Sequence, residues 1–194
     1  MTPSTIYYVA SSLDGFIADE HHGLSWLLQL DDPATRAHYE AFIGGVGALA
    51  MGSKTYDFVC RESPSAWPYT GLETWVFTHR DLPRPYPGAA IHFTADDVGA
   101  VHARMIEAAR ARGRSNLWLV GGGDLVAQFA ARGLVDELHL AIAPVFLGRG
   151  IPLLPMALPA SLTLVSTAPL GATFVDARYR WPHATNRSGA PLAT

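Results

Sequence analysis

Three consecutive glycines stand between an apolar run and an amphipathic segment, in the stretch from Val120 to Leu125. The preceding run, 117–120, has the composition of a buried strand, and the segment after the glycines carries Leu125, Val126 and Phe129 at helical spacing. Glycines at such a junction leave the backbone bare where a ligand can approach closely. The helix start adds unpaired N–H groups and a positive dipole end, which favour a phosphate. The junction therefore predicts a strand–turn–helix unit that binds a nucleotide.

The spacing of these glycines differs from the dinucleotide fingerprint of doubly wound folds. A G-x-G-x-x-G motif that begins at Gly121 would need its third glycine at position 126, where the chain has Val126. That fingerprint also lies near the first strand of its fold, whereas this junction lies in the second half of the chain. The alternative without a ligand is a tight strand–helix turn, which we expect to need one glycine rather than three. The fingerprint is absent, and both other interpretations stay open.

Apolar runs alternate with amphipathic segments along most of the chain. Strands are expected at 6–10, 48–51, 75–78, 91–94, 117–120 and 138–142, and helices over 32–44, from 52, over 94–113 and up to 132. The chain then changes to two alternating segments, 162–166 and 173–181, around Pro169-Leu170-Gly171, which is typical of a hairpin. This order predicts an α/β fold with a mainly parallel sheet, helices on both faces and an antiparallel edge.

Local signals refine two of these helices. Asp32 and Pro33 provide an N-cap and a proline at the first helical position. The residues of this helix that we expect to face inward are Ala34, Ala37, His38, Ala41 and Phe42. Thr94 and Asp97 form a capping-box-like start for the later helix. The polar stretch 19–23 is expected to be a mobile loop.

Composition bounds the class of protein. The chain has 194 residues, of which 49% are hydrophobic and 16% charged, so we expect one domain over 1–181 and a flexible tail over 182–194. The net charge of −3 and the lack of a basic block argue against nucleic acid as a partner. The single cysteine, Cys60, fits a reducing compartment, and the start of the chain lacks the features of a signal peptide or membrane helix. We therefore expect a cytoplasmic protein with no membrane partner.

Two further motifs follow predicted strands. Gly52-Ser53-Lys54-Thr55 combines a bare backbone, two hydroxyls and a cation at a helix start, which suits a pyrophosphate; the alternative is an ordinary N-cap with a solvated lysine. It lacks the upstream glycine of a P-loop. Thr78-His79-Arg80 follows another strand and could hold a ribose 2′-phosphate; the alternative is a surface turn. His21-His22 lacks a third metal ligand at helical or strand spacing, so no metal site is expected.

These motifs, in this order, carry a resemblance. The chain resembles the dihydrofolate reductase-like superfamily, specifically the branch related to the C-terminal reductase domain of the bifunctional riboflavin biosynthesis deaminase-reductase. The matching segments are Ala10–Ala18, Met51–Tyr56, Val120–Gly123, Gly133–Leu138 and Pro144–Leu153. The resemblance covers roughly residues 5–181 and rests on several motifs together.

The resemblance implies a single α/β domain with a mixed, mostly parallel sheet of about eight strands and NADPH as hydride donor. It places Ala10 and Ile17 against the nicotinamide half. The other implied cofactor-binding residues are Gly52, Ser53, Lys54, Thr55, Thr78, His79, Arg80, Gly121, Gly122, Gly123, Asp124 and Leu125. The family usually has Arg or Lys where Ser53 stands, so Lys54 or Arg80 would have to meet a 2′-phosphate.

The candidate substrate-binding residues are Asp14, Trp26, Leu27 and Phe42. Asp14 could instead cap the Asp-Gly turn, and Trp26 could instead anchor the core. A folate reductase has a carboxylate facing the pterin from its first helix, but the acidic residue here, Glu40, is expected to face elsewhere. Dihydrofolate is therefore not the expected substrate.

The combined prediction is an NADPH-dependent oxidoreductase that transfers a hydride to a small heterocyclic substrate, of the pterin or riboflavin-precursor type. No acid is well placed by sequence to supply the proton, so its source stays open between water and a group on the substrate side. The alternative is a non-catalytic module that binds or senses NADPH. We also expect a homodimer, because the C-terminal hairpin with Phe174 and Trp181 offers an apolar edge.

Overall fold

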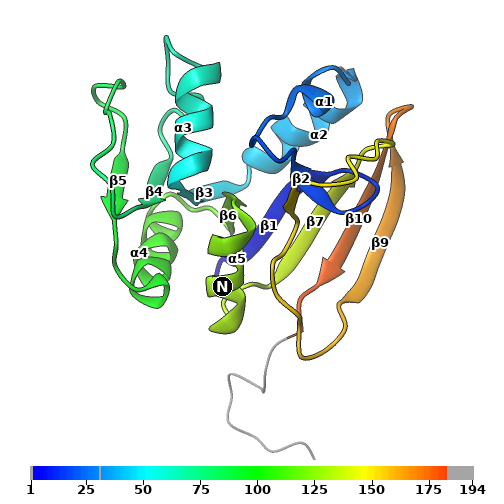
Figure 1. Cartoon of the computed structure of the whole chain (residues 1–194). Coiled ribbons are helices and arrows are strands. Elements are labelled where there is room, and N and C mark those ends of the chain that lie inside the picture. Colours follow the sequence, from blue (N-terminus) through cyan, green and yellow to red (C-terminus); the bar gives the residue numbers. More distant parts are fainter. Residues whose placement is uncertain (1, 31, 183–194) are drawn as a thin grey trace, which may run out of the picture.

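Eight strands form one sheet in the computed structural model, which describes residues 2–30 and 32–182. The strands are β1 (Ser4–Ser11), β3 (Val46–Gly52), β4 (Glu73–Phe77), β5 (Ile91–Thr94), β6 (Asn116–Gly121), β7 (Glu137–Ile142), β9 (Thr163–Leu170) and β10 (Phe174–Arg180). Their order across the sheet is β5-β4-β3-β6-β1-β7-β10-β9 (Figure 1). The pairs from β5 to β7 are parallel, and β10 pairs antiparallel with both β7 and β9. The predicted α/β fold with a mostly parallel sheet and a C-terminal hairpin is confirmed.

Helices cover both faces of the sheet, as the alternating pattern predicts. The helices α2 (Pro33–Ile43) and α3 (Ser53–Glu62) lie on one face, and α4 (Val98–Ala111) and α5 (Gly123–Ala131) lie on the other (Figure 1). The central strands are therefore buried on both faces of the sheet. Their alternate residues feed two separate apolar cores, one containing Leu119, Val101 and Phe129 and the other containing Leu49, Met51 and Tyr56. This double burial explains why β3 and β6 read as continuous apolar runs rather than alternating ones.

Three short elements were not predicted from the sequence. The strands β2 (Phe16–Ala18) and β8 (Ile151–Pro152) pair antiparallel in a second, two-stranded sheet, and α1 (Ser25–Leu28) is a single helical turn. Backbone hydrogen bonds from Leu13 N to Val145 O and from Leu153 N to Gly15 O join the same two segments. A two-residue strand such as β8 is too short to show a periodicity. Its pairing partner is also more than 130 residues away, so no local hairpin signal exists.

The helix α2 begins and ends where predicted, and its inward face agrees with the prediction at His38 and Phe42 but not at two of the alanines. Asp32 caps it, with the carboxylate accepting a hydrogen bond from Ala34 N at 2.8 Å. Ala37 and Ala41, which we expected to face inward, are exposed, whereas His38, Tyr39 and Phe42 are half-buried. Small alanines carry little information about a helix face, and the aromatic side chains determine it by packing against Tyr8.

Two boundaries also differ from the prediction. Asp97, rather than Thr94, is the N-cap of α4, because its carboxylate accepts a hydrogen bond from Gly99 N at 2.9 Å, while the Thr94 hydroxyl accepts one from Asp96 N. The hairpin turn lies at 171–173, so Pro169 and Leu170 belong to β9. A proline, which has no N–H to donate, is tolerated there since β9 is an edge strand rather than a central one.

The two residues that we expected to form an apolar edge on the C-terminal hairpin, Phe174 and Trp181, are buried. Phe174 and Trp181 are 5% and 4% exposed and pack into the chain's own cores. The exposed apolar residues of the hairpin are Leu164, Val165 and Val175. The expected tail over 182–194 lies, after Pro182, outside the described residues. No helix in the described ranges is long and apolar enough to cross a membrane.

The approach of α4 to β3 depends on one glycine. A Cβ placed on Gly47 would lie 2.5 Å from the Cα and 2.6 Å from the Cβ of Ala109 in α4. We expect Gly47→Ala to lower the free energy of unfolding by about 1–3 kcal/mol, because the helix must move off the sheet. Urea denaturation measures this change.

The matched control is Gly44→Ala, three residues earlier. Gly44 has helical backbone angles and is exposed, and the nearest atom to its added Cβ lies at 3.4 Å. This variant should stay within about 0.5 kcal/mol of the unmodified protein. Equal stabilities for the two variants would contradict the proposed close packing.

Candidate functional site

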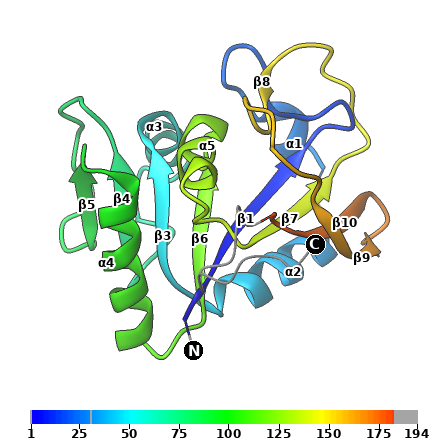
Figure 2. The same cartoon turned by 90° about the horizontal axis from the view of Figure 1, so that it is seen from below.

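A cavity of about 470 Å³ lies at the edge of the sheet where β1 and β6 end and α3 and α5 begin. Parallel strands bring their carboxyl ends, and the helix starts that follow them, to a single edge (Figure 2). Lining residues come from the two strands, the two helix starts, the β2–α1 region and the segment around β8. They are Tyr8, Val9, Ala10, Ile17, Ala18, His22, Leu24, Leu27, Lys54, Thr55, Phe58, Trp118, Val120, Gly121, Gly122, Gly123, Asp124, Ile151, Pro152 and Pro155.

The structure gives each of the three glycines a reason that needs no ligand. Gly121 and Gly122 have φ angles of +148° and +44°, in a region that side-chain-bearing residues rarely adopt. Gly123 has an ordinary φ, but a Cβ there would lie 2.9 Å from both Pro152 O and Pro155 Cδ. The expectation that a bare turn would need only one glycine is therefore wrong. The case for a ligand rests instead on where the turn lies.

Both helix starts at the cavity lack a side-chain cap. The N-cap residues are Gly52 for α3 and Gly122 for α5, and neither can supply an acceptor for the first amides of its helix. A Cβ added at either glycine would meet no atom within 4 Å, so the backbone there faces open space. The two starts are close together, because the Thr55 hydroxyl lies 3.9 Å from the Cβ position of Gly121. Two positive dipole ends therefore converge on one side of the cavity.

Lys54 adds a full positive charge beside these helix starts. It is the only lysine in the sequence. Its Nζ donates to His22 Nε2 at 2.8 Å, and His22 lies in the loop between β2 and α1 with a φ of +60°. Asp19 holds this loop by accepting hydrogen bonds from the amides of His21 and Gly23, and the Gly23 bond in particular lowers the Asp19 pKa. The contact joins two sides of the cavity.

The predicted cofactor residues divide into those that line the cavity and those that do not. Ala10, Ile17, Lys54, Thr55, Gly121, Gly122, Gly123 and Asp124 line it. Gly52 and Ser53 lie next to the lining residues but are not among them, and Leu125 is 5% exposed in the core. Asp124 is exposed in the first turn of α5, where its carboxylate interacts favourably with the positive end of the helix dipole but would repel a bound anion.

The segment Thr78-His79-Arg80 lies outside the cavity lining. The Thr78 hydroxyl accepts a hydrogen bond from Arg80 N at 2.9 Å, which is a local turn contact. The Arg80 guanidinium forms an exposed ion pair with Asp57 of α3 at 2.6 Å. Its charge is therefore paired with a carboxylate on α3, the helix that has Lys54 in its first turn.

Of the four predicted substrate-binding residues, only Leu27 lines the cavity. Asp14 binds the Ser12 hydroxyl at 2.6 Å and the amides of Leu147 and Gly148, contacts that lower its pKa, so it holds a turn. Trp26 packs with the small core of Ala143, Leu170 and Phe174. Phe42 stacks on Tyr8 at 4.1 Å between ring centroids and lies behind the cavity wall.

Sequence reasoning missed Tyr8 as a site residue. Tyr7 and Tyr8 are consecutive in β1, so their side chains point to opposite faces, and only Tyr8 lines the cavity. The Tyr8 hydroxyl lies 3.1 Å from His38 Nδ1 of α2. Burial, with the nearby Asp176 carboxylate, raises the pKa of Tyr8 to about 12, so the phenol is protonated at neutral pH. A second tyrosine within an apolar strand was the available signal.

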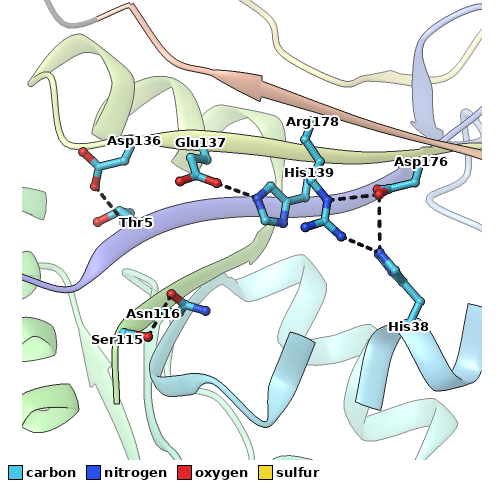
Figure 3. A network of polar contacts seen from close by, with 9 residues as sticks. All are labelled: Thr5, His38, Ser115, Asn116, Asp136, Glu137, His139, Asp176 and Arg178. Atoms are coloured by element: carbon cyan, nitrogen blue, oxygen red, sulfur yellow. Dashed lines mark hydrogen bonds and ion pairs between the residues drawn. The ribbon is translucent and has the colours of Figure 1, made fainter. Parts of the chain in front are cut away.

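His38, which contacts Tyr8, also contacts a group of ionisable residues on β7 and β10, and Figure 3 shows this group. His38 Nε2 lies 3.0 Å from Arg178 NH2 and 3.6 Å from Asp176 Oδ2. Arg178 Nε donates to Asp176 at 3.0 Å, and His139 binds Glu137 at 2.7 Å beside them. Asp176 is 8% exposed, so the pair with Arg178 compensates a buried charge.

Comparison with known proteins identifies the family of the chain. Residues 69–175 match the family described as the RibD C-terminal domain. The chain is 33% identical to the Uncharacterized protein YwjB of Bacillus subtilis (strain 168) over 153 residues, which are 79% of this chain and 83% of that protein.

Two solved structures have the same fold. A protein from Shewanella sp. PV-4 named for riboflavin biosynthesis superposes with a TM-score of 0.75 and 26% identity, over 91% of this chain and 98% of that one. The dihydrofolate reductase of Enterococcus faecalis, complexed with NADP(H), superposes with a TM-score of 0.64 over 91% and 95% of the two chains. At 16% identity, the second likeness shows the fold alone.

Proposed function

Because the chain belongs to the RibD C-terminal domain family, within the dihydrofolate reductase-like superfamily, we propose that it is an NADPH-dependent reductase of a small heterocyclic compound. The observation that carries the proposal is the cavity of about 470 Å³ between two uncapped helix starts and an aromatic wall. The two helix starts suit the phosphates of a nucleotide, and the aromatic wall suits a flat ring.

The residues present suit the phosphates of such a cofactor. The open backbone at Gly52 and Gly122 lets a pyrophosphate approach the first amides of α3 and α5 from the cavity side. Lys54 would add a charge-assisted contact, and the hydroxyl of Thr55 a neutral one. The contacts come from backbone amides rather than from Asp124, whose charge has the wrong sign. Ala10 and Ile17, farther along the wall, would meet the nicotinamide.

Arg80 is the residue that we propose to meet the 2′-phosphate. Ser53 carries no charge, and Lys54 is needed at the cavity. The ion pair between Arg80 and Asp57 is exposed, with both side chains more than 40% accessible, so it contributes little stability and a phosphate can compete for the guanidinium. If Arg80 stayed paired with Asp57, the Asp57 carboxylate would repel a 2′-phosphate and the site would favour NADH.

The substrate wall favours a small flat ring and not dihydrofolate. The side chains of Tyr8, Leu27, Phe58 and Trp118 line the cavity, and no acidic residue of α2 is among the lining residues. Glu40, the acidic residue of that helix, is exposed. The bound cofactor would supply the hydride, and the protein would align the two rings and exclude water. A pterin-like or riboflavin-precursor-like heterocycle fits these requirements.

Binding and turnover separate the reductase from a sensing module. Trp118 lines the cavity, so we expect NADPH to quench the intrinsic tryptophan fluorescence, with tighter binding than NADH. The complex should oxidise NADPH, followed by its absorbance, with at least one of a panel of pterins, pyrimidine-type flavin precursors, quinones and aldehydes. Saturable binding without oxidation across the panel would favour the sensor. Binding of neither nucleotide at high micromolar concentration would reject both functions.

The single lysine allows a test of the phosphate site. We expect Lys54→Met to weaken NADPH binding about tenfold, the loss of one partly screened charge-assisted contact, and Lys54→Arg to bind nearly as tightly as the unmodified protein. Titration at two salt concentrations measures both effects. If Lys54 contacts the pyrophosphate, its removal should weaken the binding of NADH and NADPH equally. If it contacts the 2′-phosphate, its removal should weaken the binding of NADPH alone. Unchanged affinity for both would remove Lys54 from the site.

We also propose that a second copy of the chain pairs along β9, which forms a homodimer. In the described structure β9 has one neighbour, β10, and every residue from Thr163 to Pro169 is exposed. Leu164 and Val165 are each 55% exposed, an open apolar edge of the kind that pairs with another strand. A twofold axis would join β9 to itself.

Light scattering during gel filtration should therefore give twice the 20.9 kDa mass of one chain. Val165→Lys should shift the mass to that of one chain, because a lysine on an edge strand opposes pairing. The control is Val175→Lys, at an exposed position of β10, which is not an edge strand. A single-chain mass for the unmodified protein would exclude the dimer.

A further inference from the structure

Tyr8 is a lining residue of the cavity, and the contacts of His38 decide whether the Tyr8 hydroxyl donates its proton to the imidazole or accepts one from it. His38 contacts Tyr8 through Nδ1 and Arg178 through Nε2 (Figure 3 shows the second contact). A histidine nitrogen either donates or accepts, and the other nitrogen of a neutral ring does the opposite. The partners therefore determine the tautomer.

Arg178 settles the role of Nε2. A guanidinium has only donors, so at 3.0 Å the Arg178 NH2 group must donate to His38 Nε2, which then carries no proton. Asp176 lies 3.6 Å from the same nitrogen but already accepts from Arg178 Nε at 3.0 Å, so the arginine stands between carboxylate and imidazole. The neutral ring then has its proton on Nδ1.

A protonated Nδ1 donates to the Tyr8 oxygen across the 3.1 Å contact. The Tyr8 O–H proton is then not donated to His38, which is the one hydrogen-bond contact of this hydroxyl within the described ranges. The ring of Tyr8 is held in place by Phe42, stacked at 4.1 Å, and by the edge of Trp118 at 6.1 Å. Tyr8, which lines the cavity, thus has a fixed ring and an O–H group that is available to donate to a ligand.

We propose that Tyr8 is the proton donor of the reduction and that His38 is its positioning residue. This inference rests on the proposed function. The substrate is then a heterocycle that presents a carbonyl oxygen or an imine nitrogen to Tyr8. A bound nicotinamide cofactor would supply a hydride, with two electrons, to the carbon of that double bond and would itself be oxidised. The Tyr8 O–H bond breaks, and its proton goes to the heteroatom as the new O–H or N–H bond forms.

His38 makes this transfer possible by stabilising the oxygen that is left. The Nδ1–H bond to Tyr8 strengthens as negative charge develops on the phenolate, while Arg178 keeps the imidazole in that orientation. Water replaces the Tyr8 proton after the product leaves, so the net reaction consumes one hydride and one proton. The other ionisable groups on this part of β7 and β10 are Asp176, Glu137 and His139.

The tautomer of His38 can be measured without any ligand. Long-range ¹⁵N–¹H correlation spectra of the ¹⁵N-histidine-labelled protein should show the proton of His38 on Nδ1, and Arg178→Met should shift the population towards Nε2–H. A proton on Nε2 in the unmodified protein would overturn the proposal, because Tyr8 would then donate to His38 and have none for a substrate.

Kinetics test the donor role with whichever acceptor of the panel is reduced. We expect Tyr8→Phe to lower kcat about 10²–10³-fold, as for loss of a general acid, with the NADPH dissociation constant unchanged. His38→Leu should lower kcat less, and His38→Asn should recover part of the loss, since its amide can donate near the Nδ1 position. The solvent deuterium isotope effect on kcat should fall in Tyr8→Phe.

Tyr39→Phe is the matched control, because Tyr39 is the neighbouring tyrosine, packs against Tyr8 and does not line the cavity. It should keep the full kcat, and circular dichroism should show that all variants fold. Full activity in Tyr8→Phe would reject the donor role and leave the reductase intact. If NADPH binds but no acceptor is reduced, the proposed function fails and the donor role with it, whereas the tautomer result stands separately.

Discussion

The parallel alignment of β3, β6 and β1 is the constraint on which the site depends. Parallel strands end at one edge, and the connection that follows each of these three strands runs through a helix. The helices α3 and α5 therefore begin at neighbouring points of that edge, although they cover opposite faces. Backbone amides and dipole ends converge there without any charged side chain being required. The cavity is a consequence of the topology, and Lys54 adds to a potential that already exists.

The glycine turn illustrates how one sequence feature can satisfy two requirements. Gly121 and Gly122 allow backbone angles that bring the chain from β6 into α5, and Gly123 lets the segment after β8 pack closely. The same angles leave the N-cap without a side chain and open to the cavity. The fold alone accounts for all three glycines. The position of the turn beside the α3 start is what supports a nucleotide.

The polar network that contacts Tyr8 follows a different physical rule. A buried carboxylate, Asp176, is paired with Arg178, and both are held on the antiparallel strand β10 next to β7. The arginine's remaining N–H reaches His38 on α2, and His38 reaches Tyr8 on β1. Buried polar groups must find partners, so each contact in this chain restricts the next. A charge on one strand thereby orients a phenol on another, which joins the polar network to the proposed chemistry.

The sequence by itself determined the order of strands and helices, because double burial and helix capping leave local signals. The helix boundaries at Asp32 and Gly52 and the glycine turn at 121–123 could all be located from neighbouring residues. The resemblance of several motifs added the family. Only the tertiary structure decided that Ala37 is exposed, that Asp14 holds a turn, and that Tyr8 meets His38. The contacts of His38 with Tyr8 and Arg178, for example, join residues 30 and 140 positions apart, and no local pattern in the chain provides a signal for them.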